Sequence, residues 1–327
     1  MVVNHGVPED LQRRMIEAYS DFFDMKDEEK QRYNGERIFD PIAYNTSFSR
    51  TGTEVLYWRD TLTTKVHPTF HSPDQPQNFR LSSEEFARQT REITKQLLGA
   101  ICESLGLEKN RMESSLSLEC CYQTMLASLY PPCPQPDLAL GLPPHSDSGL
   151  LTLIMQSRSS FSGLQVQHCG KWVPVQPILP NSFCIFVSDL LQIFSNGKFK
   201  SVVHRGMVDK RSSRLSVASL IGPPLEGVLV SPAHELVEAE TKPDAYGGIT
   251  YELIIYQPPQ PPHHHTRARK RGSIKSRVLL SMSREMAVGS MSREMIVVDV
   301  TGHVTEDACR LDERGGCVSG DGRAGEG

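Results

Sequence analysis

The chain has 327 residues, of which 38% are hydrophobic and 23% charged, which is enough apolar material for a folded core and argues against global disorder. Its formal net charge is −4, whereas a nucleic-acid-binding protein usually carries a basic excess, so that class is disfavoured. No apolar run approaches the ~20 residues that a membrane span needs, and no apolar segment follows a basic start as in a secretory signal.

Eight cysteines are scattered along the chain without a Cys-x-x-Cys pair, which is unlike a compact disulfide framework. Cys184 lies between Phe183 and Ile185, where cysteine serves as a small core residue. The expected compartment is therefore the reducing cytoplasm.

Residues 1–110 are expected to form a mostly helical N-terminal region. Residues 1–3 are typical of the end of a buried strand, and His5 follows in a turn, where a structural role is favoured over a ligand role. Pro8 suits the first position of a helix, because the next apolar residues recur at helical spacing as far as Phe22.

Residues 35–80 show no firm periodicity and are expected to form short strands and loops. A second helix is predicted to begin at a capping box made by Ser82 and Glu85. Its apolar face continues to Leu105, and Gly106 is expected to end it.

Short β-rich runs separated by Gly, Pro, Asn and Ser mark residues 120–225 as an all-β catalytic domain. Many short strands with punctuated turns predict an antiparallel sandwich or barrel, and a double-sheet jelly roll is one member of that class. The runs are residues 122–130, 151–155, 164–167, 172–175, 183–187, 201–204 and 215–220.

Residues 226–256 are expected to extend the catalytic domain, and residues 257–327 to form a poorly ordered tail. The tail contains a Pro/Gln-rich segment, three histidines at 263–265, a basic stretch at 267–277 and a repeated SMSREM sequence. Weak metal binding by the histidines and a nuclear or nucleic-acid role for the basic stretch are both ranked below a solvated tail.

The strongest chemical pattern combines His145 and Asp147 with His204 further along the chain. Alternate residues of an extended strand face the same side, so His145 and Asp147 can reach one metal ion. His204 lies in another strand-like run and can supply a third ligand. Two histidines and one carboxylate leave coordination positions open, which is the pattern of non-haem Fe(II) oxygenases, whereas structural zinc takes four protein ligands.

Arg214 and Ser216 are expected on one face of the strand that follows His204. If a hairpin is symmetric about Asp209, His204 and Arg214 become cross-strand neighbours. A guanidinium fork binds a carboxylate with two hydrogen bonds. A molecule with an α-keto acid at one end and a carboxylate at the other would bridge the metal and Arg214, and 2-oxoglutarate has that structure.

These motifs, in their order and spacing, resemble the plant 2-oxoglutarate- and Fe(II)-dependent dioxygenases, which include flavonoid oxygenases, gibberellin oxidases and the ethylene-forming oxidase. The resemblance extends from residue 1 to about residue 251 and is specific for the family rather than for a substrate. It is carried by Val-Asn-His-Gly-Val at 3–7, Leu-Tyr-Pro-Pro-Cys-Pro at 129–134, Gly-Leu-Pro-Pro-His-Ser-Asp at 141–147, Gly-Leu-Gln-Val at 163–166, Ser-Asn-Gly at 195–197 with Ser-Val-Val-His-Arg at 201–205, and Arg-Leu-Ser-Val-Ala at 214–218.

The resemblance implies an α+β fold, in which a helical N-terminal region packs on a distorted double-stranded β-helix (jelly roll) with iron inside. It implies that His145, Asp147 and His204 bind the iron. It also implies that Arg214 and Ser216 bind the carboxylate of 2-oxoglutarate that lies away from the iron. Tyr130 matches a family tyrosine that contacts the same cosubstrate, and Ser128 stands where many members have asparagine.

The implied activity couples oxidative decarboxylation of 2-oxoglutarate to hydroxylation or desaturation of a small molecule, either a specialised metabolite or a hormone. Fe(II), 2-oxoglutarate and O2 are implied, with ascorbate as reductant, and the enzyme is expected to be a monomer. Leu150, Phe186 and Leu220 are candidate substrate contacts, although core packing is favoured for each.

Two departures from the family pattern leave alternatives open. Members usually carry some tens of residues before the first motif, and they continue from Tyr251 into a helix that covers the site. The chain is therefore expected to be shortened at its start and atypical at its end. The alternatives are a same-fold oxidase that does not use 2-oxoglutarate, as in the ethylene-forming branch, and an inactive relative.

Overall fold

The computed structural model describes residues 1–35, 37–46, 56–157, 161–175, 181–238 and 246–256, and the backbone of four short strands in the tail. These strands are β16 (Glu294–Met295), β17 (Val298–Asp299), β18 (Cys309–Leu311) and β19 (Cys317–Val318). The rest of the tail, with its histidine tract and basic stretch, lies outside the described residues.

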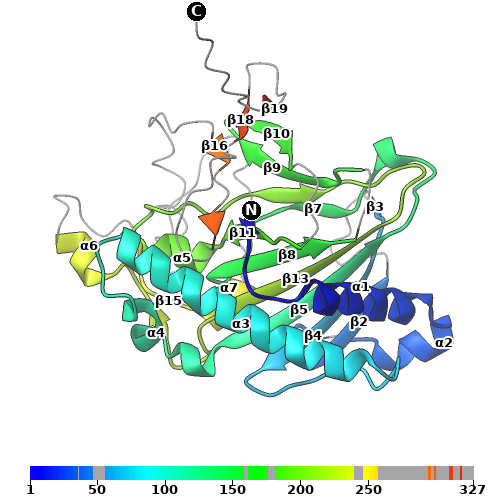
Figure 1. Cartoon of the computed structure of the whole chain (residues 1–327), viewed down its shortest axis with the longest axis horizontal. Helices are drawn as coiled ribbons and strands as arrows, with labels where there is room; N and C mark the ends of the chain where they lie inside the picture. The colour runs from blue at the N-terminus through cyan, green and yellow to red at the C-terminus, as the bar shows by residue number, and fades with distance from the viewer. Residues whose placement is uncertain are drawn as a thin grey trace, which may run out of the picture.

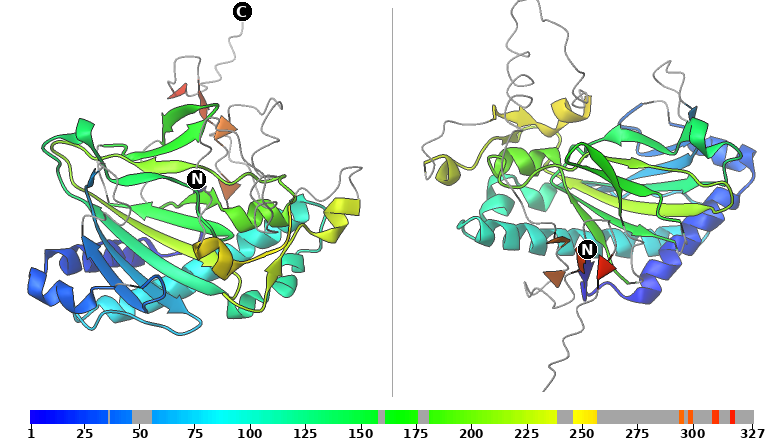
Figure 2. Two further views of the ribbon diagram at one scale, coloured as in Figure 1. Left: turned by 180° about the vertical axis from the view of Figure 1, so that it is seen from behind. Right: turned by 90° about the horizontal axis from the view of Figure 1, so that it is seen from above.

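Two antiparallel sheets form the centre of the molecule (Figures 1 and 2). The major sheet has the strand order β11-β8-β13-β5-β4-β2, and the minor sheet has the order β10-β9-β12-β7. This arrangement agrees with the predicted jelly roll. The major-sheet strands are β2 (Ile42–Thr46), β4 (Asp60–His67), β5 (Tyr122–Tyr130), β8 (Leu151–Gln156), β11 (Cys184–Val187) and β13 (Arg214–Gly222), and the minor-sheet strands are β7 (Leu142–His145), β9 (Leu164–His168), β10 (Lys171–Pro174) and β12 (His204–Gly206).

Helices α1 (Glu9–Asp24) and α3 (Phe79–Ser104) cover the face of the major sheet opposite the minor sheet (Figure 1). Tyr19 and Phe79 join the two helices in an edge-to-face contact with ring centroids 4.9 Å apart. Gln123 of β5 ties α3 to the sheet, because its side-chain amide donates to Ala87 O at 3.0 Å and to Ser219 Oγ at 2.9 Å. The helices thus cover the outer face of the major sheet, whereas its inner face is turned toward the minor sheet.

Shorter elements complete the described fold, and among the described residues no helix combines the length and apolar character needed to cross a bilayer. They are β1 (Val2–Val3), α2 (Asp27–Lys30), η1 (Gln31–Tyr33), β3 (Leu56–Tyr57), α4 (Arg111–Ser115), η2 (Leu118–Cys120), η3 (Pro136–Leu138), β6 (Ala139–Leu140), α5 (Asp189–Phe194), β14 (Leu229–Val230), α6 (His234–Glu238), β15 (Ile249–Thr250) and α7 (Tyr251–Tyr256).

Most of the predicted strands end within two residues of the observed ones, but three local predictions were wrong. The run 201–204 is a strand only from His204 onward. Pro8 precedes α1 as its N-cap and is not its first helical residue. Helix α3 begins at Phe79, so Ser82 lies inside the helix and does not cap it.

His5 has the structural role that was favoured for it. Its side chain is buried, the Val7 backbone N–H donates to Nδ1 at 3.1 Å, and Nε2 lies 3.1 Å from Asn181 O. Because the carbonyl can only accept, Nε2 carries the proton in this arrangement. The ring therefore fastens the N-terminal turn to the segment before β11.

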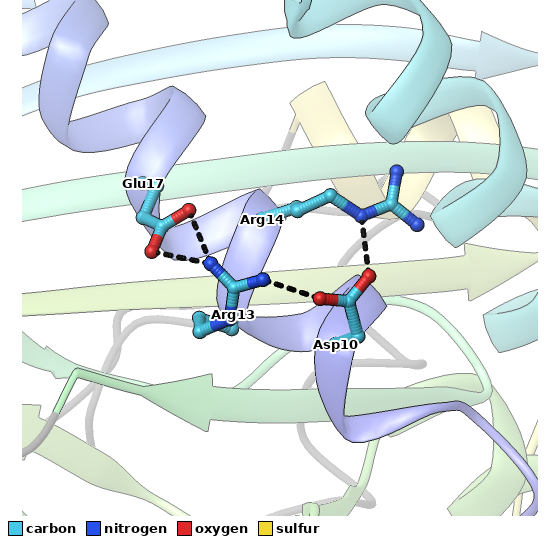
Figure 3. A network of polar contacts seen from close by, with 4 residues as sticks. All are labelled: Asp10, Arg13, Arg14 and Glu17. Atoms are coloured by element: carbon cyan, nitrogen blue, oxygen red, sulfur yellow. Dashed lines mark hydrogen bonds and ion pairs between the residues drawn. The ribbon is translucent and has the colours of Figure 1, made fainter.

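The exposed face of α1 carries a network of ion pairs among Asp10, Arg13, Arg14 and Glu17 (Figure 3). Arg13 Nη1 lies 2.8 Å from Glu17 Oε1, and Arg14 Nε lies 2.9 Å from Asp10 Oδ2. These spacings place the partners on one side of the helix. Exposed pairs of this kind stabilise a helix only weakly, so the network contributes little to the stability of the fold.

Gly106 ends α3 as predicted, with a φ of +74°. The Leu107 N–H donates to Cys102 O at 2.9 Å and the Gly106 N–H to Glu103 O at 3.0 Å, which is a Schellman motif. A Cβ at this position would meet nothing within 4 Å, so the only cost of Gly106→Ala is the left-handed backbone. We expect urea denaturation to show a loss of about 1 kcal/mol in the free energy of unfolding. Gly106→Asn should lose less, and an alanine variant as stable as wild type would contradict this account.

Candidate active site

Three potential metal ligands meet between the two sheets. Within the described part of the chain, His145, Asp147 and His204 form the one group of this kind, with ligand atoms all within 4.8 Å of one another. His145 ends β7 and pairs directly with His204 of β12. Asp147 follows two residues after the end of β7, and its Oδ1 lies 3.5 Å from His145 Nε2 and 3.8 Å from His204 Nε2.

The local sequence explains why β7 can carry this group. Pro143 and Pro144 cannot donate to a ladder, and β7 is the edge strand of the minor sheet, where prolines are tolerated. The β12–β7 pairing shifts its register between His204 and Gly206, an irregularity of the kind that re-aims side chains.

Both histidines direct Nε2 toward the centre of the group. His145 Nδ1 lies 2.9 Å from Pro143 O, and His204 Nδ1 lies 3.1 Å from Val202 O. Each Nδ1 must be the protonated donor, which leaves Nε2 with a free lone pair. Burial lowers the pKa of His204 to about 4, so its imidazole is neutral near pH 7 and able to bind a metal.

Asp147 supplies the negative charge of the group. Burial would raise the pKa of its carboxyl, but the polar interactions with the neighbouring rings of His145 and His204 outweigh burial and lower the pKa to about 2. Its Oδ2 is buried and has no hydrogen-bond partner among the described residues. A buried, ionised oxygen without a partner fits a cation that binds there.

The N-terminus of α5 holds the loop that carries Asp147. The Asp189 N–H donates to Asp147 O at 2.8 Å, and the Leu190 N–H donates to Gly149 O at 2.9 Å. Ser146 Oγ donates to Asp189 Oδ2 at 3.0 Å. These contacts fix the loop from behind, so the ligand position does not depend on β7 alone.

Arg214 and Ser216 lie on the major sheet, opposite the metal-ligand group. Arg214 pairs with Tyr130 and Ser216 pairs with Ser128 in the β13–β5 ladder. The Arg214 side chain is 3% exposed, and its guanidinium carbon lies 4.1 Å from the centre of the Tyr130 ring. Its Nε and Nη2, two nitrogens on one edge of the guanidinium plane, are buried and have no partner among the described residues. That edge is the one that binds a carboxylate with two parallel hydrogen bonds.

The predicted hairpin that would make His204 and Arg214 cross-strand neighbours was wrong. His204 pairs with His145 and Val166 in the minor sheet, whereas Arg214 pairs with Tyr130 in the major sheet. Residues 207–213 pass from one sheet to the other instead of forming a tight hairpin. The two side chains still meet, because the sheets face each other across one cavity.

All seven residues singled out from the sequence line this cavity: Ser128, Tyr130, His145, Asp147, His204, Arg214 and Ser216. Leu220 lines it as well, whereas Leu150 is fully buried in the main core. Phe186 packs against the His204 ring with centroids 4.7 Å apart. Of the three candidate substrate contacts, Leu220 is thus placed at the cavity and the other two are packing residues.

Several cavity residues were missed in the sequence. The apolar ones are Leu126, Leu142, Ile154, Leu164 and Ala218. Leu126 and Ala218 could have been found, since they lie two residues from Ser128 and Ser216 in predicted strands and must share their face. Ile154 and Leu164 could not have been identified in this way, because the face of the sheet to which their side chains point depends on how strands far apart in the sequence pair.

Family comparisons cover most of the described chain. The 2OG-Fe(II) oxygenase superfamily matches residues 115–223, and the family described as non-haem dioxygenase in morphine synthesis N-terminal matches residues 1–87. The chain is 41% identical over 252 residues to 2-oxoglutarate-dependent dioxygenase 19 of Oryza sativa subsp. japonica, covering 77% of this chain and 73% of that protein. It is 34% identical over 257 residues to a leucoanthocyanidin dioxygenase of Perilla frutescens, covering 76% and 70%.

Solved structures give the same result. A crystal structure of JOX2 in complex with 2OG, Fe and JA matches with a TM-score of 0.72 and 29% identity, over 77% of this chain and 75% of that one. The family uses Fe(II), 2-oxoglutarate and O2, with ascorbate as reductant. The chain therefore belongs to the 2OG-Fe(II) oxygenase superfamily and is a 2-oxoglutarate- and Fe(II)-dependent dioxygenase that acts on a small molecule.

Proposed function

We propose that His145, Asp147 and His204 bind the catalytic Fe(II). The observation that carries this assignment is the register pair His145–His204, which brings two free Nε2 atoms within 3.8 Å of the Asp147 carboxylate. Two imidazoles and one carboxylate suit Fe(II) and leave positions for other ligands. The His145 side chain is 33% exposed and that of His204 is 4% exposed, so the group is open on the His145 side.

We also propose that Arg214 and Ser216 bind the far carboxylate of 2-oxoglutarate, with Tyr130 and Ser128 completing its surroundings. The free guanidinium edge of Arg214 offers two donors, and the Ser216 hydroxyl lies two residues away on the same strand face. A molecule held at this end can reach the metal-ligand group with its keto acid, because both ends lie in one cavity. When bound, Fe(II) supplies the activation of O2 and the oxidation of a C–H bond.

The protein residues then orient the reactants and exclude water. Leu126, Ala218 and Leu220 give the cavity an apolar wall between the two polar ends, which disfavours bulk water around the cosubstrate. The reaction is the hydroxylation or desaturation of a specialised metabolite or hormone. The named relatives act on several compounds, and the substrate class rests on that similarity.

The enzyme is further proposed to act as a cytoplasmic monomer. The six cysteines in the described part of the chain are all free thiols, which suits a reducing compartment. Size-exclusion chromatography and fractionation of the host cell test these two points.

The first test needs no substrate. We expect purified protein with Fe(II) and 2-oxoglutarate under anaerobic conditions to give the visible charge-transfer band of the chelate, and aerobic turnover to release succinate. Iron binding without a band would favour the oxidase type of chemistry that does not use 2-oxoglutarate. Absence of iron binding in a folded protein would overturn the proposed site.

Gly163 offers a test of the Arg214 position. A Cβ at residue 163 would lie 2.7 Å from Arg214 Nε and 2.9 Å from Met207 O. The backbone carbonyl cannot move aside as a side chain can, so the strain should displace the arginine. We expect Gly163→Ala to weaken 2-oxoglutarate binding about tenfold and to leave Fe(II) affinity unchanged in anaerobic titrations. Equal losses for both ligands would indicate general damage instead.

A further inference from the structure

Buried nitrogen donors without partners gather around Tyr130. Among the described residues, Trp58 Nε1, Arg59 Nε and Nη1, and Arg214 Nε and Nη2 are buried atoms that make no hydrogen bond. None of the ion pairs found in the described ranges involves Arg59 or Arg214. A buried N–H without an acceptor is unfavourable, so a cluster of such groups indicates that a ligand supplies the acceptors.

The strand register places Arg59 and Arg214 on opposite sides of the same tyrosine. Asp60, the first residue of β4, pairs with Leu129, so the ladder direction places Arg59 beside Tyr130. On the other side, Arg214 pairs with Tyr130 through β13. Trp58 packs against the small apolar cluster that contains Tyr130, and its backbone N–H donates to Leu140 O at 2.8 Å, which fixes the start of β4.

The guanidinium groups of Arg59 and Arg214 affect the pKa of the Tyr130 hydroxyl. Burial raises the pKa of Tyr130, but the positive charges of Arg214 and Arg59 nearby outweigh burial and lower the pKa. The hydroxyl of a neutral phenol can donate its proton in a hydrogen bond. A hydrogen bond from that proton to a carboxylate is charge-assisted and therefore strong.

We propose that Arg59 is a positioning residue for 2-oxoglutarate, which orients the Tyr130 hydroxyl toward the far carboxylate and adds a second positive charge at that end of the cavity. The inference rests on the proposed function, because it needs the far carboxylate to lie at Arg214. The carboxylate then has donors from two sides, with Arg214 binding it directly and Arg59 acting through Tyr130.

The test compares two α-keto acids that differ in the far carboxylate. Binding of 2-oxoglutarate and of pyruvate to the Fe(II) protein is measured anaerobically, by the charge-transfer band or by calorimetry. We expect Arg59→Gln to weaken 2-oxoglutarate about tenfold and to leave pyruvate unchanged, since pyruvate has no carboxylate at that end. Arg59→Lys keeps the charge and should recover part of the loss. Arg88→Gln on the exposed face of α3 is the matched control.

A double-mutant cycle with Tyr130→Phe tests the route of the effect. If Arg59 acts through the phenol, Arg59→Gln should cost less in the Tyr130→Phe background than in wild type. Equal weakening of 2-oxoglutarate and pyruvate, or no effect on either, would overturn the proposal. If Arg59→Gln does not fold, Arg59→Lys gives the same comparison. Wild-type protein that binds no 2-oxoglutarate would instead refute the proposed function itself.

Discussion

His204→Ala is expected to abolish measurable Fe(II) binding, with a loss in affinity of at least about 100-fold. The side chain is buried beside His145, with ring centroids 4.2 Å apart, and alanine cannot replace its Nε2. Two ligands would remain, and neither offers a second nitrogen toward the vacated position. Anaerobic calorimetry with Fe(II) measures the affinity, and the charge-transfer band with 2-oxoglutarate should disappear in parallel.

The matched control is His234→Ala, because His234 is 75% exposed and lies in α6 outside the site. Its iron affinity should equal that of wild type. Circular dichroism of both variants checks that the sheets are intact, since His204 also packs against Phe186. A folded His204→Ala protein with wild-type iron affinity would remove His204 from the proposed ligand set.

Arg214→Gln is expected to lower the affinity for 2-oxoglutarate by at least about 100-fold while Fe(II) affinity stays unchanged. The expected loss is that of two charge-assisted hydrogen bonds, each of which contributes ~1.5–3 kcal/mol. Arg214→Lys should recover little, because an ammonium group keeps the charge but lacks the planar fork. Titration of the charge-transfer band with 2-oxoglutarate gives the affinities.

The burial of Arg214 also leads to a prediction about the thermal stability of the protein without ligands. Its charge is buried with no carboxylate partner among the described residues, and burial lowers its pKa. Removing an uncompensated buried charge relieves a desolvation cost. The melting temperature of ligand-free Arg214→Gln should therefore not fall below that of wild type, whereas Arg13→Gln on exposed α1 should change neither stability nor binding. A clear drop in melting temperature would show that Arg214 is a structural residue.

The metal-ligand group could be predicted because its signal is local and chemical. His145 and Asp147 are two residues apart in the sequence, and few residue types bind iron, so a histidine in a later strand-like run is a natural third ligand. The strand β5 was also predicted with its observed bounds, since a run rich in apolar and aromatic residues begins at Tyr122 and ends before the prolines that follow Tyr130.

Features that depend on long-range pairing could not be predicted. The strands before residue 110 show no clear alternation, yet β4 and β2 extend the major sheet beside β5. The β4 sequence is rich in threonine and polar residues on both faces, so hydrophobic period alone does not reveal it. The position of Arg59 beside Tyr130 could not be predicted from the sequence either, because it follows from the pairing of β4 with β5.

The capping-box error has a similar physical origin. Ser82 and Glu85 have the spacing of a capping box, but Phe79 is fully buried against Tyr19, and the helix begins four residues earlier than a Ser82 cap would place it. Tertiary packing of a large aromatic residue outweighed a local capping preference, whose contribution is typically about 1 kcal/mol.

The proposed metal ligands lie on, or just after, strands of the minor sheet, whereas Arg214 and Ser216 lie on the major sheet, so iron and 2-oxoglutarate bound there would link the two sheets. A ligand that binds only the folded state adds RT ln(1 + [L]/Kd) to stability, or about 2.7 kcal/mol at 100 times its Kd. Iron and 2-oxoglutarate together would join two sheets that, among the described residues, share no ladder hydrogen bonds. The lifetime of the folded enzyme in the cell should then follow the supply of both molecules, so that cosubstrate concentration sets abundance as well as rate.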